Sequence, residues 1–421
     1  MLNTIQYRLI NRKRGIANAM ANHVFYYPTP ITLNYAWSFG SLVGLFFGLQ
    51  LVTGIFLAMH YTAHVDFAFE SVVHIMTDVY GGCLIRCMHV NGASMIFILL
   101  YLHLAHGLFF RSYVNKRKIF WWSGIAIFLL MMATAFIGYV LPWGQMSFWG
   151  ATVITSLVTA VPVVGETIAY WVWGGFSINK ATLIRFFSIH YLLPFIITGL
   201  ILIHLLLWHS GDSLNPAQKP VGFNVQFNRY FTAKDTFIFN ITFLIFIIVC
   251  IYCSNMRSYS DNFVNANPFV TPHIVPEWYF TPFYAILRAC PNKLVGIIVM
   301  LSGILVLFIL PYFKLSLTSL PPVKSVLYQA AYGIFIAVFL ILIFLGGQPT
   351  AAPFVIASKL FTTLYFVYLL AFLPIYSLIY AIDLEDRINH LFMFLTDSLD
   401  KRLDWIEDWL ERLEKVKWFT K

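Results

Sequence analysis

The stretch HVNGASMIFILLYLH, residues 89–103, begins and ends with histidine and carries no charged side chain between them. A second stretch, HYLLPFIITGLILIH at residues 190–204, repeats both properties with the same interval of 14 residues. Fourteen helical residues at about 100° each fall roughly 40° short of four full turns, so each pair shares one helix face, about 21 Å apart along the axis. Two such helices facing each other would bring the four imidazoles together as two stacked pairs.

The composition predicts that these helices lie in a membrane. The 421 residues are 60% hydrophobic and only 11% charged, too little charge to cover a soluble protein of this length. Backbone groups in lipid need internal partners, so we expect an all-α integral membrane protein, with the first four helices forming a bundle. Eight uncharged apolar stretches have the length that crosses a hydrocarbon core: 37–61, 87–110, 119–140, 186–209, 236–256, 294–313, 326–345 and 360–382.

The basic residues predict the orientation of the chain. Before the C-terminal tail, segments on the side of the termini hold 13 lysines and arginines, and segments on the opposite side hold 7. The termini are therefore expected to face the cytoplasm or its organellar equivalent. This asymmetry also explains the net charge of +9. No basic patch interleaved with aromatic residues indicates nucleic-acid binding.

The chain divides into four expected regions. Two long apolar connections, residues 141–173 and 257–293, fall on the side opposite the termini, and long ordered loops are usually functional. Prolines and glycines interrupt the first, which predicts short helices along the membrane interface. The regions are a basic segment at 1–35, a four-helix domain at 36–212, a second four-helix domain with the proline-rich loop at 213–382, and a charged tail at 383–421.

The tail has a different composition, with 10 acidic and 7 basic residues. Its apolar residues step by four and three, which predicts an amphipathic helix: Leu399, Leu403, Ile406, Leu410 and Leu413. We expect this helix to dock on a partner or on the membrane surface. The five cysteines form no disulfide framework, and Cys250 and Cys253 are interpreted as packing residues inside the fifth span.

The paired histidines have the spacing expected of haem ligands. Haem iron accepts imidazole as an axial ligand, and iron with both axial positions filled can only pass electrons. Helices two and four run in the same direction, so His89 would pair with His190 on the far side and His103 with His204 nearer the termini. No C-x-x-C-H motif is present, so both haems would be non-covalent. A lone membrane histidine often satisfies a backbone group, but two equally spaced pairs favour metal ligation.

Glycines repeat the interval of the histidines. A missing side chain would let a porphyrin edge approach the backbone, while tight helix packing through small residues is the alternative. The glycines are Gly40 and Gly54 in the first span and Gly124 and Gly138 in the third. Arg86, three residues before His89, could pair with a haem propionate or simply reach the membrane edge.

Several motifs together resemble the cytochrome b family, the di-haem membrane subunit of ubiquinol–cytochrome c reductase, respiratory complex III. The resemblance covers roughly residues 30–380 and rests on Gly40-Ser41-Leu42, Ala58-Met59-His60-Tyr61-Thr62, His89-Val90-Asn91-Gly92-Ala93-Ser94, Gly138-Tyr139-Val140-Leu141-Pro142-Trp143-Gly144-Gln145 and Pro276-Glu277-Trp278-Tyr279. It implies two quinone pockets on opposite faces. Chain fusion and the 14-residue interval fit the respiratory branch better than the photosynthetic one.

The resemblance implies a quinol-oxidation pocket beside the far-side haem. Tyr139, Gly150, Glu277, Tyr279 and Tyr284 would line it. Glu277 lies in an apolar proline-rich loop, where desolvation should raise its pKa and suit it to accept a quinol proton. A structural salt bridge is the alternative role for this carboxylate.

On the other face, the resemblance implies a quinone-reduction pocket lined by His209, Ser213 and Asp235. A histidine and an aspartate at the water boundary can deliver protons, although Asp235 could instead be a first-turn acid favoured by the helix dipole. Two positions depart from the family pattern. His106 replaces the usual arginine, which weakens propionate pairing, and Leu214 replaces the usual asparagine of the reduction pocket.

The expected function follows from the resemblance. The chain would oxidise quinol at one face, carry electrons across the membrane through two b-type haems and reduce quinone, such as ubiquinone, at the other face, contributing to proton-motive force. A Rieske-type iron–sulfur protein, a membrane-anchored cytochrome c subunit, other complex III subunits and a second copy of the chain would be its partners. The mitochondrial inner membrane is expected, with the bacterial plasma membrane as alternative. A transporter and a di-haem anchor of a dehydrogenase remain rival classes.

Overall fold

The computed structural model describes residues 26–114, 117–209, 224–252, 259–313, 325–381, 397–409 and 411–412. Within these residues eight helices are long and apolar enough to cross a membrane, which confirms the predicted all-α membrane fold. They are α3 (Phe39–Ala58, preceded by the single turn η1, Tyr35–Ser38), α5 (Gly82–Phe109), α6 (Lys118–Val140), α9 (Lys180–His209), α10 (Phe227–Tyr252), α12 (Lys293–Ile309, followed by η5, Leu310–Tyr312), α13 (Val326–Gly346) and α14 (Ala352–Val367), which continues through the π-helical η7 (Tyr368–Phe372) into α15 (Leu373–Ala381).

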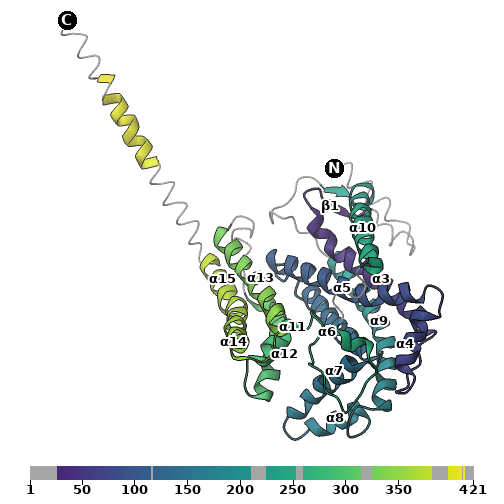
Figure 1. Ribbon diagram of the computed structural model, residues 1–421. Helices are drawn as coiled ribbons and strands as arrows, with labels where there is room; N and C mark the ends of the chain where they lie inside the picture. The colour runs from purple at the N-terminus through teal and green to yellow at the C-terminus, as the bar shows by residue number, and fades with distance from the viewer. Residues whose placement is uncertain are drawn as a thin grey trace.

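The long helices form two groups that lie side by side (Figure 1). In the first group α3 packs on α5, α6 packs on α9, and α10 packs on α5. In the second group α13 packs against α14 and against the short helix α11 (Thr281–Arg288). Phe46, Phe97 and Ile125 are at most 1% exposed at the centre of the first group. The first four spans therefore form the bundle expected to hold the cofactor sites.

Short elements cover both ends of this bundle. At one end lie α4 (Ala68–Thr77), α7 (Gln145–Ser156), η3 (Leu157–Ala160) and α8 (Gly165–Trp173). They confirm the prediction of short helices within residues 141–173. At the other end β1 (Pro28–Pro30) pairs antiparallel with β2 (Asn224–Gln226). The end of α15 lies on the same side as β1, as an even number of spans requires (Figure 1).

Three helices begin about two turns earlier than the sequence windows predicted, namely α9, α10 and α14. Each additional segment contains charged residues: Arg185 in α9, Lys234 and Asp235 in α10, and Lys359 in α14. The windows excluded charge because charge is costly in hydrocarbon. A helix can nevertheless continue past the membrane edge, where the charged side chains reach water.

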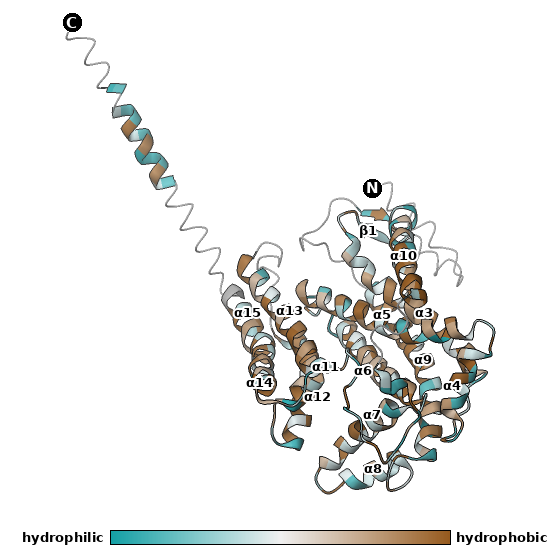
Figure 2. Ribbon diagram, viewed as in Figure 1, coloured by the Kyte–Doolittle hydropathy of each residue, from teal (hydrophilic) through white to brown (hydrophobic). Residues whose placement is uncertain are grey.

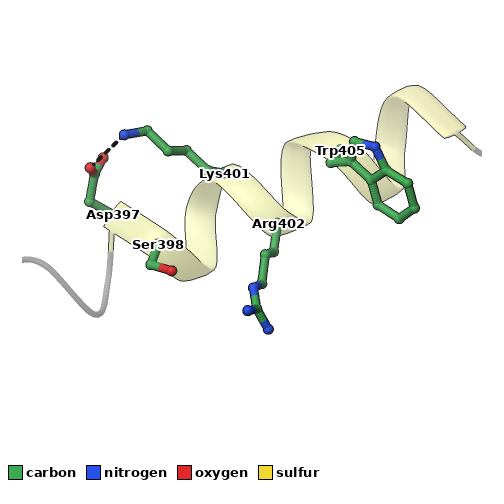
Figure 3. A pocket seen from close by; sticks show the side chains of 5 residues that line it. All are labelled: Asp397, Ser398, Lys401, Arg402 and Trp405. Carbon is green, nitrogen blue, oxygen red and sulfur yellow. Dashed lines mark hydrogen bonds and ion pairs between the residues drawn. The ribbon is translucent and has the colours of Figure 1, made fainter.

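The tail is helical over residues 397–409, and most of its other residues lie outside the described part of the chain. Figure 2 shows apolar residues along the long spans and mixed character along this helix. Leu399 and Leu403 are 59% and 57% exposed. Lys401 Nζ lies 2.8 Å from Asp397 Oδ2, and both side chains line a hollow whose lining residues all belong to this single helix (Figure 3). No second described element closes the hollow, so it is not a candidate functional site.

Candidate functional site

The far-side histidine pair meets between two helices. His89 of α5 and His190 of α9 have ring centroids 6.4 Å apart and ring planes at 82°. A metal–imidazole bond is about 2 Å long, so two imidazoles on opposite sides of one metal ion have ring centres roughly 6 Å apart. The observed separation would therefore leave room for one metal ion between the two rings. His103 and His204, the other pair, also lie close enough to interact electrostatically.

Each of the four histidines packs against one of the four equally spaced glycines. A Cβ added to Gly54 would lie 3.1 Å from His89 Cε1, and a Cβ added to Gly40 would lie 3.0 Å from His103 Cε1. On the facing helices, Gly124 meets His204 in the same way at 3.2 Å, and Gly138 meets His190 more closely still. The sequence suggested that these glycines make room for a porphyrin edge. The structure shows that they also make room for the imidazoles themselves.

Three of the imidazoles are oriented by a hydrogen bond at Nδ1. The His190 ring nitrogen lies 2.9 Å from the Thr134 carbonyl oxygen, which can only accept. The Thr53 hydroxyl lies 2.9 Å from His89 Nδ1 and donates its own hydrogen to the Leu49 carbonyl, so it accepts from the histidine. Nδ1 therefore carries the proton in both rings, and the Nε2 lone pair is left available for a metal.

The same device recurs at the second pair. The Ser123 hydroxyl lies 2.7 Å from His204 Nδ1 and donates its hydrogen to the Phe120 carbonyl. The Phe120 ring also stacks on His204 with centroids 4.4 Å apart. Sequence reasoning missed these hydroxyl partners. Thr53 and Ser123 each directly precede one of the spaced glycines, Gly54 and Gly124, and this adjacency is the signal that could have revealed them.

These observations fit a bis-imidazole metal cofactor. The ring separation, the glycine beside each ring and the Nδ1 partners all agree with haem bound through Nε2. Among the described residues, no cluster of three or more histidine, cysteine, aspartate or glutamate side chains could hold a metal ion with protein ligands alone. The arrangement therefore suits a cofactor that brings its own equatorial ligands.

A cavity of about 520 Å³ opens beside the far-side pair, within the size range of ligand and cofactor sites. The predicted residues that line it are His89, His190, Gly54, Gly138, Arg86, Tyr139, Glu277 and Tyr279. Arg86 thus faces the same space as the ligand His89. Two predicted residues, Gly150 and Tyr284, are not among those that line the cavity. A Cβ added to Gly150 would stand 4.0 Å from the Tyr139 ring. The centre of the Tyr284 ring lies 5.0 Å from the Arg288 guanidinium carbon.

The polar residues of the cavity are held by their own partners. The Tyr139 hydroxyl donates to Asn262 Oδ1 at 2.8 Å, and Glu277 lies beside it. Asn262 was missed because it comes from η4 (Ser260–Phe263), a turn with no periodic pattern. Burial raises the pKa of Tyr279 well above its usual range, and the neighbouring Glu277 carboxylate raises it further. The Tyr279 hydroxyl therefore stays protonated at neutral pH.

Two backbone segments next to Tyr139 and Asn262 are hydrogen-bonded to each other. The Gln145 main-chain amide donates to the Val264 carbonyl at 2.9 Å, and the Ala266 amide donates to the Trp143 carbonyl at 3.1 Å. Gly144 lies between them, where an added Cβ would come within 3.0 Å of the Asn262 carbonyl oxygen. The turn that follows α6 and the loop before the Pro276–Tyr279 segment are thus tied together.

On the opposite face, the structure places two of the three predicted quinone-site residues. Asp235 of α10 accepts hydrogen bonds from the Ser38 hydroxyl at 2.7 Å and the Ser41 hydroxyl at 3.5 Å, at the beginning of α3. His209, the last residue of α9, has its ring 4.3 Å from that of Tyr27. Ser213, the third residue, lies outside the described residues.

Comparison with known proteins identifies the family. Two family models match the chain, the cytochrome b/b6/petB model over residues 24–211 and the C-terminal cytochrome b/b6/petD model over residues 265–366. The chain belongs to the cytochrome b family. Cytochrome b of Rickettsia conorii is 49% identical over 361 residues, which cover 85% of this chain and 90% of that protein. Cytochrome b of Chondrus crispus is 48% identical and covers 89% of this chain and 99% of its own length.

Further relatives agree in sequence and in structure. Cytochrome b of Solanum tuberosum is 50% identical over 364 residues, 86% of this chain and 92% of that protein. A solved chain of a hyperthermophilic respiratory Complex III matches with a TM-score of 0.82 at 29% identity, over 89% of this chain and 99% of that chain. The relatives come from a bacterium as well as from eukaryotes, so this cytochrome b is a multi-pass membrane protein of either setting.

One departure from the cytochrome b pattern is visible three residues after His103. His106 stands where the family resemblance leads us to expect arginine. Its ring packs edge-on against Trp37, with centroids 4.5 Å apart, and its Nε2 is buried without a hydrogen-bond partner among the described residues. The other departure, Leu214, lies outside the described part of the chain.

Proposed function

We propose that this cytochrome b is the di-haem membrane core of a quinol–cytochrome c oxidoreductase. His89 and His190 would hold one b-type haem and His103 and His204 the other. The observation that carries this proposal is that every histidine of the two pairs rests on a glycine at the matching interval, with room for one metal ion between the far-side rings. When bound, two such haems conduct electrons between the faces of the membrane.

The part of the far-side cavity beside Tyr139, Glu277 and Tyr279 is proposed as the site of quinol oxidation, and the part between His89 and His190 would hold the haem. Leu141, Pro142 and Phe195 contribute apolar surface for a quinone ring and its tail, and Glu277 contributes a carboxylate. A quinol must release two protons on oxidation, and Glu277 is the group at the cavity wall that can accept one. The Tyr279 hydroxyl can donate to a quinone oxygen, and the Tyr139 hydroxyl, whose hydrogen goes to Asn262, can accept from a quinol hydroxyl.

Quinone reduction is proposed on the opposite face, beside the haem of His103 and His204. His209, Ser213 and Asp235 would supply protons to the reduced ring. The Ser38 and Ser41 hydroxyls donate to the Asp235 carboxylate and fix its position at this face. The alternative of a first-turn acid is wrong for Asp235, because α10 begins at Phe227 and its first turn holds no acidic residue.

The remaining components of the reaction must come from other chains. A Rieske-type iron–sulfur protein would accept the first quinol electron and pass it to a membrane-anchored cytochrome c subunit, since the described residues hold no cysteine and histidine cluster that could bind iron for this step. The Complex III match supports assembly with other subunits. We propose ubiquinol as substrate, a homodimer and a place in the respiratory chain on the same grounds.

A reduced-minus-oxidised optical spectrum with haem quantification tests the proposal. It should show b-type bands and two haems per chain, and His89→Leu should remove one of them. Two independently inhibited quinone sites are expected. A colourless purified protein would instead indicate a transporter, and a single inhibitable quinone site would indicate a di-haem anchor.

A further inference from the structure

Helix α5 carries a second functional face besides its ligand face. Ser94, Phe97 and Tyr101 are spaced by three and four residues, so they share one side of the helix. That side is roughly 130° around the axis from the side of His89 and His103. The helix that presents two haem ligands in one direction therefore presents a polar and aromatic stripe in another.

The stripe contacts the loop that forms the quinol cavity. Trp278 Nε1 donates to the Ser94 hydroxyl at 3.2 Å. The rings of Phe97 and Tyr279 stack with centroids 4.2 Å apart and an interplanar angle of 5°. The Tyr101 hydroxyl donates to the main-chain carbonyl of Tyr279. Three consecutive contacts thus fix two adjacent loop residues to α5.

Tyr101 differs from the other two members of the stripe. Ser94 and Phe97 line the cavity together with Tyr279, and Tyr101 does not. The Tyr101 ring instead packs between Phe128 of α6 and Phe339 of α13, with centroids 5.9 and 5.2 Å away. Tyr101 therefore contacts the loop from the side away from the cavity, and its own ring is packed against α6 and α13.

We propose that Tyr101 is a positioning residue for quinol oxidation. Its hydrogen bond to the Tyr279 carbonyl sets the distance of Glu277 and Tyr279 from the haem ligand His89, because ligand and anchor belong to one rigid helix. This inference rests on the proposed function and adds to it a residue outside the cavity that determines how well the cavity is formed. Misplacement of reacting groups by a fraction of an ångström is costly in rate.

The test compares Tyr101→Phe with Tyr332→Phe in the purified oxidoreductase complex. The Tyr332 hydroxyl donates to the Ala105 carbonyl of the same helix at 2.9 Å, one turn beyond Tyr101, so both variants remove a hydroxyl bonded to a main-chain carbonyl. Loss of such a buried bond predicts a fall in kcat/KM for quinol of roughly 5- to 30-fold in Tyr101→Phe only. Both variants should retain two haems, and quinone should reoxidise the pre-reduced haem of His103 and His204 at the rate of the unmodified complex.

Ser94→Ala provides a second, independent measurement. It removes the acceptor of Trp278, so it should lower kcat/KM for quinol in the same direction, and its effect should combine less than additively with that of Tyr101→Phe. Equal kcat/KM values for Tyr101→Phe and Tyr332→Phe, with both haems present, would overturn the positioning role and leave the proposed function intact. Absence of quinol oxidation or of two haems in the unmodified complex would overturn the proposed function.

Discussion

Replacing Gly54 by valine should remove the far-side haem and spare the other. Gly54 lies in α3, and its added Cβ would stand 3.1 Å from His89 Cε1. The imidazole cannot move away freely, because the Thr53 hydroxyl holds its Nδ1 at 2.9 Å. The haem of His103 and His204 lies about 21 Å along the bundle and should not respond.

The expected loss of haem affinity can be estimated from the steric overlap between the new side chain and the His89 ring. An ordinary carbon–carbon contact is about 3.5–4.0 Å, so even alanine would overlap the ring by roughly half an ångström. Overpacking of this kind costs about 1–3 kcal/mol, and for alanine the better helix propensity offsets about 1 kcal/mol. Valine adds two branched methyl groups and less helix propensity. We therefore expect Gly54→Ala to weaken haem binding about tenfold or less, and Gly54→Val to weaken it about 100-fold or more.

The assay is haem content per chain in the purified complex, measured with redox difference spectra. Gly54→Val should give one haem where the unmodified chain gives two, and the spectrum should lose one b-type component. Gly48→Val is the matched control, because Gly48 lies in the same helix with nothing within 4 Å of its added Cβ. Two haems in Gly54→Val, or equal losses in both variants, would refute the steric reasoning.

Three further variants test other parts of the site. Thr53→Val removes the acceptor at His89 Nδ1 and should weaken far-side haem binding about 10- to 100-fold, measured by haem loss on dilution. Thr152→Val is the control, because it removes a half-buried hydroxyl that bonds only to the Phe148 carbonyl of its own helix. Glu277→Gln should lower kcat for quinol oxidation about 100-fold with both haems retained, and an unchanged kcat would exclude Glu277 as proton acceptor. Asp235→Asn should slow quinone reduction in stopped-flow measurements while quinol oxidation at the far face continues.

The membrane-spanning helices were predictable because lipid imposes a compositional rule. Uncharged apolar stretches located all eight spans, because a stretch of about 20 such residues is typical of a membrane-spanning helix. The same rule failed at helix ends. The backbone of α10 is not helical at Asn228 and Arg229, and the helix that follows this kink includes Lys234 and Asp235. Lys234 Nζ donates to the Leu33 carbonyl at 2.6 Å. Such a contact depends on a neighbouring segment, which composition does not reveal.

The four histidines could be predicted from the sequence, but the residues that contact them could not. The interval of 14 residues predicts which histidines share a face, because helix periodicity is local. The partners of their Nδ1 atoms come from other helices, as Thr134 does for His190, and local periodicity says nothing about them. Asn262 was harder still to foresee. It reaches Tyr139 from a turn 123 positions away, and only the tertiary fold brings them together.

The repeated interval of the glycines has a physical cause in helix register. In α3 the first glycine, Gly40, rests on the second histidine of α5, His103, and the second glycine, Gly54, rests on the first, His89. The two helices are therefore antiparallel, and equal intervals are required for both contacts to form. α6 and α9 follow the same rule. One inserted residue would turn the following part of the helix by about 100° and carry its glycine away from the imidazole. The interval of 14 residues is therefore set by the distance between the two histidine pairs, and the neighbouring helices need the same interval to place a glycine beside each histidine.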